Sequence, residues 1–418
     1  MTHAPNRTKR ICALVAAGVI VGWFAVTSTA QQASASRYLA TWVGDADTAD
    51  SDFLAILDVD PRSKTYTRVL ASAPANARGT IPHHTEHEFV PGHPLFANGF
   101  AGNRTFRFDL SDPLHPRLLG EIAPTPGFTF PHSFLRLPNG NVLATMQANG
   151  PTFLPPGGLA EFRDDGSAVR TSSAANDVDP AARPYSLVLL PEQDRIVVSC
   201  ARMVLPKGIA APSPIDNPGY VIQLWRLSDL RLLKTVPVVP PAGSRPNIQS
   251  GPAELRRTAA GDIFFVSAFG GGMFRVSGLE PDTFHAELVY DFGGGAYLPV
   301  LVGHYWIQAI PSLRRVVALD ISNAAKPFEI SRVDFDERQS PHWLALDPLS
   351  NRIIVANQSV MDESRLWMLH MDPVSGLLSI DTTFHDPGND RPGVSFDHED
   401  WPHGRTGRGA PHGSVFLN

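Results

Sequence analysis

The stretch FPHSFLRLPNGNVLATM, residues 130–146, contains the pattern on which the fold prediction depends. Its first part alternates in polarity, its middle is a turn built from Pro138, Asn139, Gly140 and Asn141, and its last part is strongly apolar. A two-residue alternation is typical of a β-strand, and proline, glycine and asparagine are typical of turns. The stretch therefore predicts two antiparallel strands joined by a turn.

Three further segments repeat this pattern: RPYSLVLLPEQDRIVVS from Arg183, SGPAELRRTAAGDIFFVS from Ser250 and SPHWLALDPLSNRIIVAN from Ser340. A third strand of the same kind follows each unit, and a fourth follows in several of them, such as LLKTVPVV from Leu232. Four strands per unit are typical of a propeller blade, and most unit starts are about 40–50 residues apart, as in propeller repeats. The expected unit starts are His84, His132, Tyr185, Ala253, His304, His342 and His412, and the two longest intervals hold insertions at 203–219 and 384–410.

The two ends of the chain are incomplete in complementary ways. The C-terminal segment APHGSVFLN has only the first strand of a unit, whereas the segment from Tyr38 to Ala71 has the later strands without a first one. Pairing of the last strand with these three strands completes a seventh blade and closes the ring without exposed edges. We therefore predict an all-β fold, a seven-bladed β-propeller formed by one domain at 36–418 and closed by its N- and C-terminal strands.

Histidines follow proline at the start of four of these units. They occur in Pro82-His83-His84, Pro131-His132, Pro341-His342 and Pro411-His412. A single histidine in such a turn is more often a hydrogen-bonded structural residue. However, the first strand of each blade lines the central channel, and closure makes these four blades consecutive. We therefore expect His83, His84, His132, His342 and His412 to converge at one channel mouth as metal ligands.

Nitrogen ligands of this kind suit copper, with iron or zinc as alternatives, whereas calcium prefers oxygen ligands. Tyr185 has the equivalent place in another unit and is a candidate catalytic residue that gates access or donates a hydrogen bond; it could equally be an ordinary pore residue. Glu86, Glu88 and the acidic loop 396–400 are candidate partners that orient the imidazoles, or they form solvated loops. His87 could supplement the site or face solvent.

The first residues resemble a secretory signal. Arg7, Lys9 and Arg10 precede an apolar run at 11–26, and Ala33-Ser34-Ala35 is a small-residue cleavage pattern. We expect residues 1–35 to be a signal peptide and the mature protein to be periplasmic or secreted, without stable membrane insertion after cleavage. A retained membrane anchor is the alternative, because the 16-residue run is near the shortest span of a bilayer.

Composition excludes several classes of site. Without residues 1–35 the chain has 32 basic and 41 acidic residues, a net charge of −9, which argues against nucleic acid as a partner. Cys200 is the one cysteine beyond the signal, since Cys12 lies within it. An internal disulfide, a thiolate metal cluster and a paired-cysteine redox centre are therefore excluded.

Several of these motifs resemble the selenium-binding protein family, whose bacterial members include methanethiol oxidases. The resemblance lies in HHT at 83–85, RFDLSDPLHPRLLGEI, FPHSFLRLPNGNVLATM and SPHWLALDP, and it is clearest in residues 38–150. Two family features are missing: the cysteine pair expected soon after HHT, where this chain has EHEFVPGHP, and the tryptophan-rich tail. The chain thus resembles a divergent member, and selenium attachment through cysteine is not expected.

The resemblance implies an exported seven-bladed propeller with a histidine-bound copper centre. It implies a reaction of a small thiol, methanethiol in the family, with oxygen and water to an aldehyde, hydrogen sulfide and hydrogen peroxide. By motif, His83 and His84 match the paired histidines of the family, His132 and His342 match its proline-histidine pairs, and His412 matches a C-terminal histidine.

Two other functions are compatible with the sequence. PHWLALDPLSNRIIVANQ and HMDPVSGLLSI resemble the repeats of propeller lactonases, although four convergent histidine positions are unusual there. A non-enzymatic periplasmic binding or scaffold propeller is the other alternative, because propellers often present a face to partners. The metal, the substrate and the oligomeric state are not determined by the sequence.

Overall fold

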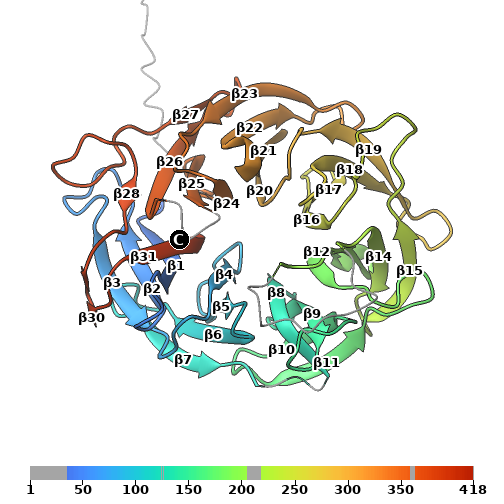
Figure 1. The fold of residues 1–418 in the computed structure, drawn as a ribbon, viewed down its shortest axis with the longest axis horizontal. Coiled ribbons are helices and arrows are strands. Elements are labelled where there is room, and N and C mark those ends of the chain that lie inside the picture. Colours follow the sequence, from blue (N-terminus) through green and yellow to red (C-terminus); the bar gives the residue numbers. More distant parts are fainter. Residues whose placement is uncertain (1–34, 124, 126, 205–217, 358–362, 418) are drawn as a thin grey trace, which may run out of the picture. The chain divides into compact units, whose positions relative to one another are not determined.

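The computed structural model describes residues 35–123, 125, 127–204, 218–357 and 363–417, which form a ring of antiparallel sheets around a central axis (Figure 1). The helical elements of this described part are two 3-10 turns, η1 (Pro191–Gln193) and η2 (Pro311–Leu313). It contains no helix with the length and apolarity needed to cross a membrane. The chain divides into Met1–Ala33 and Ser34–Asn418, and the ring belongs to the second unit. The expected signal peptide and most of the 203–219 insertion lie outside the described residues.

The strands form seven blades, and the all-β propeller prediction is confirmed. Blade 1 contains β4 (Pro82–Thr85), β5 (Leu95–Gly99), β6 (Arg104–Asp109) and β7 (Arg117–Glu121). Blade 2 contains β8 (Phe128–Arg136), β9 (Val142–Asn149), β10 (Gly158–Phe162) and β11 (Ala168–Ser173). Blade 3 contains β12 (Pro184–Leu190), β13 (Arg195–Cys200), β14 (Val221–Arg226) and β15 (Arg231–Pro237). Blades 4 and 5 contain β16 (Pro252–Arg257), β17 (Ile263–Ser267), β18 (Gly272–Ser277) and β19 (His285–Asp291); and β20 (Pro299–Val302), β21 (Tyr305–Ile310), β22 (Arg315–Asp320) and β23 (Phe328–Asp334).

Blade 6 contains β24 (Pro341–Leu346), β25 (Arg352–Asn357), β26 (Arg365–Met371) and β27 (Leu378–Ile380), with β28 (Val394–Ser395) added beside β26. The insertion at 384–410 also forms a small hairpin, β29 (Asp400–Trp401) with β30 (Gly404–Arg405). Blade 7 joins the two ends of the described chain in the order β3 (Val69–Pro74), β2 (Phe53–Asp58), β1 (Tyr38–Asp45) and β31 (Gly409–Leu417).

Closure of the ring occurs as the complementary ends predict. β31 pairs antiparallel with β1, with Leu39 opposite Phe416 and Thr41 opposite Ser414. The indole Nε1 of Trp343 on blade 6 donates a hydrogen bond to the Ser414 carbonyl, 3.0 Å away. Backbone pairing thus completes blade 7, and a side-chain hydrogen bond connects it to blade 6.

Strand alternation explains the core. In β2 every residue is buried, and successive side chains point to opposite faces of the sheet. Phe53, Ala55 and Leu57 pack in a cluster with residues of blade 6, and Leu54 and Ile56 pack in a cluster with residues of blade 1. Each blade therefore buries both of its faces against its neighbours, so the apolar core lies between blades.

Six of the seven inner strands share a distortion that positions the site. Each inner strand contains a proline, which lacks an N–H and is tolerated on a strand with only one hydrogen-bonded neighbour. In every blade except blade 5, the register with the next strand shifts by one residue directly after this proline. Such a β-bulge redirects side chains. The residues in these bulges include His83, His84, His132, His342 and His412.

The prediction that His304 starts the fifth unit is wrong. The inner strand there is β20, which begins at Pro299 and pairs without a bulge. His304 lies in the turn after β20, with half of its side chain exposed and its Nε2 3.6 Å from Oδ2 of Asp320. Every inner strand contains a proline near its start, and the proline of blade 5, Pro299, is not followed by a histidine.

The closing strand should contribute strongly to stability. Phe416 on β31 is 3% exposed, and Phe328 on β23 is 51% exposed. We expect Phe416→Ala to lower the free energy of unfolding by about 3–5 kcal/mol, because it leaves a cavity between blades, and Phe328→Ala to change it by less than about 0.5 kcal/mol. Urea unfolding of both variants tests this. Equal effects of the two substitutions would contradict the role of β31 in closure.

Candidate metal centre

Five histidines from four inner strands meet at the end of the ring where those strands begin. His83 and His84 lie on β4, His132 on β8, His342 on β24 and His412 on β31, and all five are buried. The ring centroid of His83 lies 4.4 Å from that of His84, 5.2 Å from His132, 4.7 Å from His412 and 5.7 Å from His342. The structure thus brings together all five residues that the proline-histidine pattern selected.

Three of these imidazoles form the tightest group. His83, His84 and His132 each offer a ring nitrogen, and these nitrogens all lie within 4.8 Å of one another. The group can therefore hold a metal ion. His342 and His412 stand 4.8 Å apart by ring centroid, and both rings lie within 5.7 Å of the His83 ring. They are neighbours of this group rather than members of it.

Backbone carbonyls determine which nitrogen two of the histidines present. Nδ1 of His132 lies 2.9 Å from the Tyr185 carbonyl oxygen, and Nδ1 of His412 lies 2.7 Å from the His83 carbonyl oxygen. A carbonyl oxygen only accepts hydrogen bonds, so each Nδ1 carries the proton and each Nε2 carries a lone pair. Metal-binding histidines are commonly oriented in this way.

Four of the imidazoles have a buried nitrogen without a hydrogen-bond partner. These atoms are Nε2 of His83, Nδ1 of His84, Nε2 of His132 and Nδ1 of His342. Buried polar atoms in native proteins are nearly always satisfied. Four orphaned nitrogens in one cluster, with no carboxylate in the tightest group, fit a transition metal with nitrogen ligands.

Burial keeps these imidazoles neutral, which metal binding requires. Desolvation lowers the pKa of His132 to about 3 and that of His412 to about 4. It lowers the pKa values of His83, His84 and His342 well below the ordinary value, and charge repulsion from neighbouring histidines adds to the effect.

Glu254 is a site residue for which sequence reasoning proposed no role. It lies on β16 and is 1% exposed, with Oε1 4.0 Å from Nε2 of His84 and Oε2 3.9 Å from Nε2 of His87. Arg256 at 2.9 Å and Ser186 at 3.3 Å hold the same carboxylate, while Oε1 has no hydrogen-bond partner. A signal existed: in Pro252-Ala253-Glu254 this glutamate has the position that His84 has in Pro82-His83-His84.

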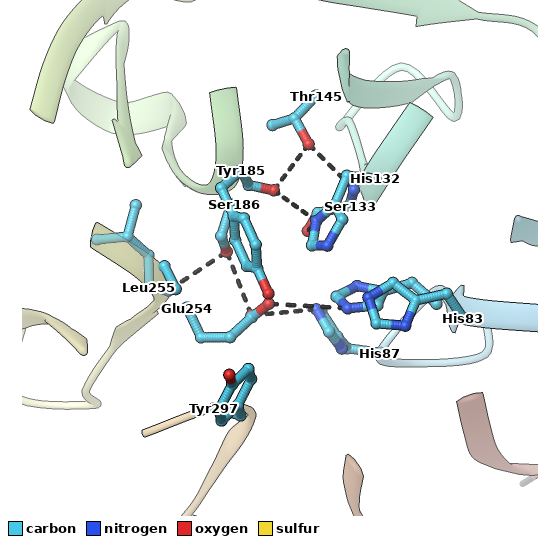
Figure 2. A network of polar contacts seen from close by, with 12 residues as sticks. His83, His87, His132, Ser133, Thr145, Tyr185, Ser186, Glu254, Leu255 and Tyr297 are labelled. Atoms are coloured by element: carbon cyan, nitrogen blue, oxygen red, sulfur yellow. Dashed lines mark hydrogen bonds and ion pairs between the residues drawn. The ribbon is translucent and has the colours of Figure 1, made fainter. Parts of the chain in front are cut away.

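His87 and Tyr185 complete the surroundings (Figure 2). The His87 ring stacks on Trp343 at 5.3 Å and lies 5.9 Å from the His84 ring, so it lies beside the cluster, with part of its side chain exposed. The Tyr185 ring lies 3.9 Å from that of His132, and its hydroxyl points toward Glu254 (Figure 2). Burial, and next the Glu254 charge, raise the pKa of Tyr185 well above its ordinary value, so its hydroxyl keeps its proton.

The acidic residues that were candidate partners of the imidazoles, with solvated loops as the alternative, lie in other contacts or in solvent. Glu86 is buried but pairs with Arg136, at 3.0 Å, and accepts a hydrogen bond from the Phe96 amide. Glu88 and the acidic side chains of the 396–400 loop are exposed. Glu86 pairs with Arg136 of the neighbouring inner strand, and the exposure of the other residues agrees with the solvated-loop alternative.

Glu254 should strengthen metal binding through its charge: its Oε1 lies 4.0 Å from Nε2 of His84 and favours a proton on that nitrogen, which leaves the lone pair of Nδ1 for the ion. We expect Glu254→Gln, which keeps the shape and removes the charge, to weaken affinity for Cu²⁺ or Zn²⁺ by about 10–100-fold. Competition with a chromophoric chelator measures this. Glu88→Gln, a change at an exposed glutamate near the channel, is the control, and equal affinities in the two variants would contradict the assignment.

The metal-free protein should lose stability in mild acid. Unfolded histidines bind protons near pH 6.5, whereas the pKa of folded His132 is about 3. The stabilising contribution is therefore complete above pH 6.5 and declines as the pH falls toward the folded value, by up to about 1.4 kcal/mol per pH unit for each such histidine. Urea unfolding with a chelator between pH 7 and pH 4 tests this. His132→Gln should reduce the slope and His304→Gln should not; identical slopes would refute the explanation.

Comparison with known proteins gives one match in sequence and several in fold. No protein-family model matches the chain. A methanethiol oxidase from Hyphomicrobium sp. is 28% identical over 244 residues, which cover 55% of this chain and 52% of that protein. The chain therefore matches only about half the length of this curated relative.

Two solved structures have the same fold. A hypothetical selenium-binding protein from Sulfolobus tokodaii has a TM-score of 0.68 at 17% identity, covering 92% of this chain and 94% of its own. A periplasmic gluconolactonase from Pseudomonas aeruginosa has a TM-score of 0.60 at 15% identity, covering 91% and 99%. At these identities the likeness concerns the fold, which proteins of different function share. The sequence match to the Hyphomicrobium enzyme confirms the resemblance to the selenium-binding protein and methanethiol oxidase family that the proline-histidine motifs indicated.

Proposed function

We propose that this protein is an exported, copper-dependent oxidase of small thiols. The observation that carries the proposal is the convergence of five buried, neutral imidazoles, four of them with an orphaned nitrogen, at one end of the ring. The similarity to a methanethiol oxidase supports thiols as the substrate class.

The proposed reaction converts a thiol with a hydrogen-bearing carbon, together with oxygen and water, to an aldehyde, hydrogen sulfide and hydrogen peroxide. The carbon–sulfur bond breaks and a carbon–oxygen double bond forms, with its oxygen taken from water. The carbon loses two electrons, which reduce oxygen to hydrogen peroxide, and the sulfur leaves as hydrogen sulfide. Methanethiol would yield formaldehyde, and all atoms balance.

His83, His84 and His132 would hold the metal, with His342 and His412 as further donors beside them. When bound, copper stabilises the thiolate form of a substrate and transfers electrons between substrate and oxygen. Imidazole nitrogen is a suitable donor for copper, and iron and zinc are the alternatives. The orphaned nitrogens support this proposal because a metal ion would satisfy them.

The protein's own groups would prepare the site. The carbonyls of Tyr185 and His83 fix the rings of His132 and His412, and Glu254 faces the Nε2 of His84. Burial excludes water from the thiolate, which strengthens electrostatic interactions. Tyr185 would limit access beside His132, and its hydroxyl, which keeps its proton, points toward Glu254 (Figure 2).

Export remains part of the proposal through residues 1–35, whose charged start, apolar run and small residues are typical of a cleaved signal. The mature protein would then act in the periplasm or outside the cell. Its partners would be a small thiol and oxygen, without nucleic acid and without stable membrane insertion.

The test combines metal content with catalysis. We expect protein isolated from the periplasm to contain copper and to consume oxygen with methanethiol, producing hydrogen sulfide and hydrogen peroxide. His132→Ala and His342→Ala should lower copper content and activity by at least about tenfold, because each removes a buried ligand or its neighbour. His304→Ala, at a half-exposed histidine of blade 5, should change neither.

Other outcomes would favour the alternatives. Full copper occupancy in both His132→Ala and His342→Ala would overturn the site assignment. Metal-free protein that hydrolyses sugar lactones would favour a propeller lactonase, a function carried by a protein of similar fold. Protein without metal and without either activity would favour a binding or scaffold role.

A further inference from the structure

A pocket of about 330 Å³ opens beside the histidine cluster, with His83 and His412 in its wall. The rest of its wall comes from loops of blades 6, 7 and 1, among them the residues around Asp45 and Ser364. Two other pockets, of about 410 and 390 Å³, contain His87 in their walls but none of the five clustered histidines. The first pocket is therefore suited to bring a substrate to the proposed metal centre.

This pocket is larger than methanethiol requires. A water molecule occupies about 30 Å³ in the liquid, so 330 Å³ accommodates on the order of ten non-hydrogen atoms. Methanethiol has only a carbon and a sulfur. The remaining space is suited to a thiol that carries a further group directed away from the histidines.

Asp45 lies in the wall of this pocket and has one buried carboxylate oxygen without a hydrogen-bond partner. It ends β1 and is 4% exposed; Oδ2 accepts a hydrogen bond from the Asp50 amide at 2.7 Å, while Oδ1 has no partner. The hydroxyl of Ser364, 5% exposed, is also unpartnered. Two buried polar atoms in one pocket wall thus lack the partners that such atoms normally have.

The other charges around the pocket are already compensated. Glu363 pairs with Arg365 and Arg391, and Arg365 also pairs with Asp386. Both oxygens of Asp52 accept hydrogen bonds, from the Asp45 amide and from Thr80. Among the described residues, no lysine or arginine lies within ion-pair distance of Asp45. The uncompensated charge in the wall is therefore negative.

The titration of Asp45 agrees with this geometry. Burial is the largest effect and raises the pKa of Asp45; the hydrogen bond from the Asp50 amide opposes this rise, and the neighbouring Asp47 carboxylate adds to it. A positively charged ligand group would stabilise the ionised form.

From the pocket, its free carboxylate oxygen and its position at His83 and His412, we propose that the substrate is a small aminothiol, whose ammonium group binds Asp45 while its sulfur reaches the histidine cluster. This inference rests on the proposed thiol oxidase function and specifies its substrate class. For 2-aminoethanethiol the same reaction with oxygen and water gives aminoacetaldehyde, hydrogen sulfide and hydrogen peroxide, so atoms and electrons balance.

Binding to the zinc-loaded protein tests the inference without turnover, because Zn²⁺ is redox-inert. Isothermal titration calorimetry without oxygen would compare 2-aminoethanethiol, ethanethiol and mercaptoacetate. We expect 2-aminoethanethiol to bind at least about tenfold more tightly than the other two, since hydrogen bonds to charged groups are strong. Asp45→Asn, which preserves the acceptor for the Asp50 amide, should reduce this preference to about twofold or less. Asp50→Asn, at an exposed position of the same loop, should retain it.

The outcomes separate this inference from the function on which it rests. If zinc binds and all three thiols bind with equal affinity, or if Asp45→Asn retains the preference, the aminothiol inference is overturned and thiol oxidation stands. If neither metal nor any thiol binds, the proposed function fails and the inference fails with it. Should Asp45→Asn not fold, the comparison of the three thiols in the unchanged protein still decides.

Discussion

Backbone pairing between β31 and β1 is the constraint on which the rest of the structure depends. It completes blade 7 from the two ends of the described chain and removes the edges of the ring. It also places His412 beside His83, where the His412 ring donates to the His83 carbonyl. The cluster therefore exists only in the closed ring, because its members come from four blades that closure makes consecutive. The stability of the ring and the geometry of the candidate site therefore both depend on the pairing of β31 with β1.

The candidate site also depends on the burial of several imidazoles whose nitrogens lack hydrogen-bond partners. In an exposed loop each imidazole would form hydrogen bonds with water. Here the blades bury the imidazoles, so protonation is unfavourable and several nitrogens have no hydrogen-bond partner. Such an arrangement costs stability in the absence of a ligand, since buried polar atoms without partners are unfavourable. A bound metal ion would offset that cost. Glu254 adds the one buried carboxylate that faces this cluster within the described residues.

Blade 5 differs from the four blades that supply the clustered histidines. Its inner strand contains a proline like the others, yet it pairs without a bulge and contributes no histidine. In the other blades the extra residue after proline turns side chains toward a shared point. The fold is shared with proteins named for other functions, so the chemistry resides in these few bulge residues and in the loops above them.

The sequence by itself determined the architecture and the five clustered histidines, because strand alternation, turn prolines and complementary chain ends are local signals that repeat in each blade. The sequence-based prediction placed one unit start at His304, whereas the inner strand of that unit, β20, begins at Pro299. Only the tertiary structure decided which polar residues lie beside the cluster. Glu254 faces it, whereas Glu86 pairs with Arg136. His87 lies near His84, and a pocket with Asp45 in its wall adjoins His83. The physical reason is that these contacts join different blades, so they depend on bulge geometry and on the angle between blades, which no local pattern encodes.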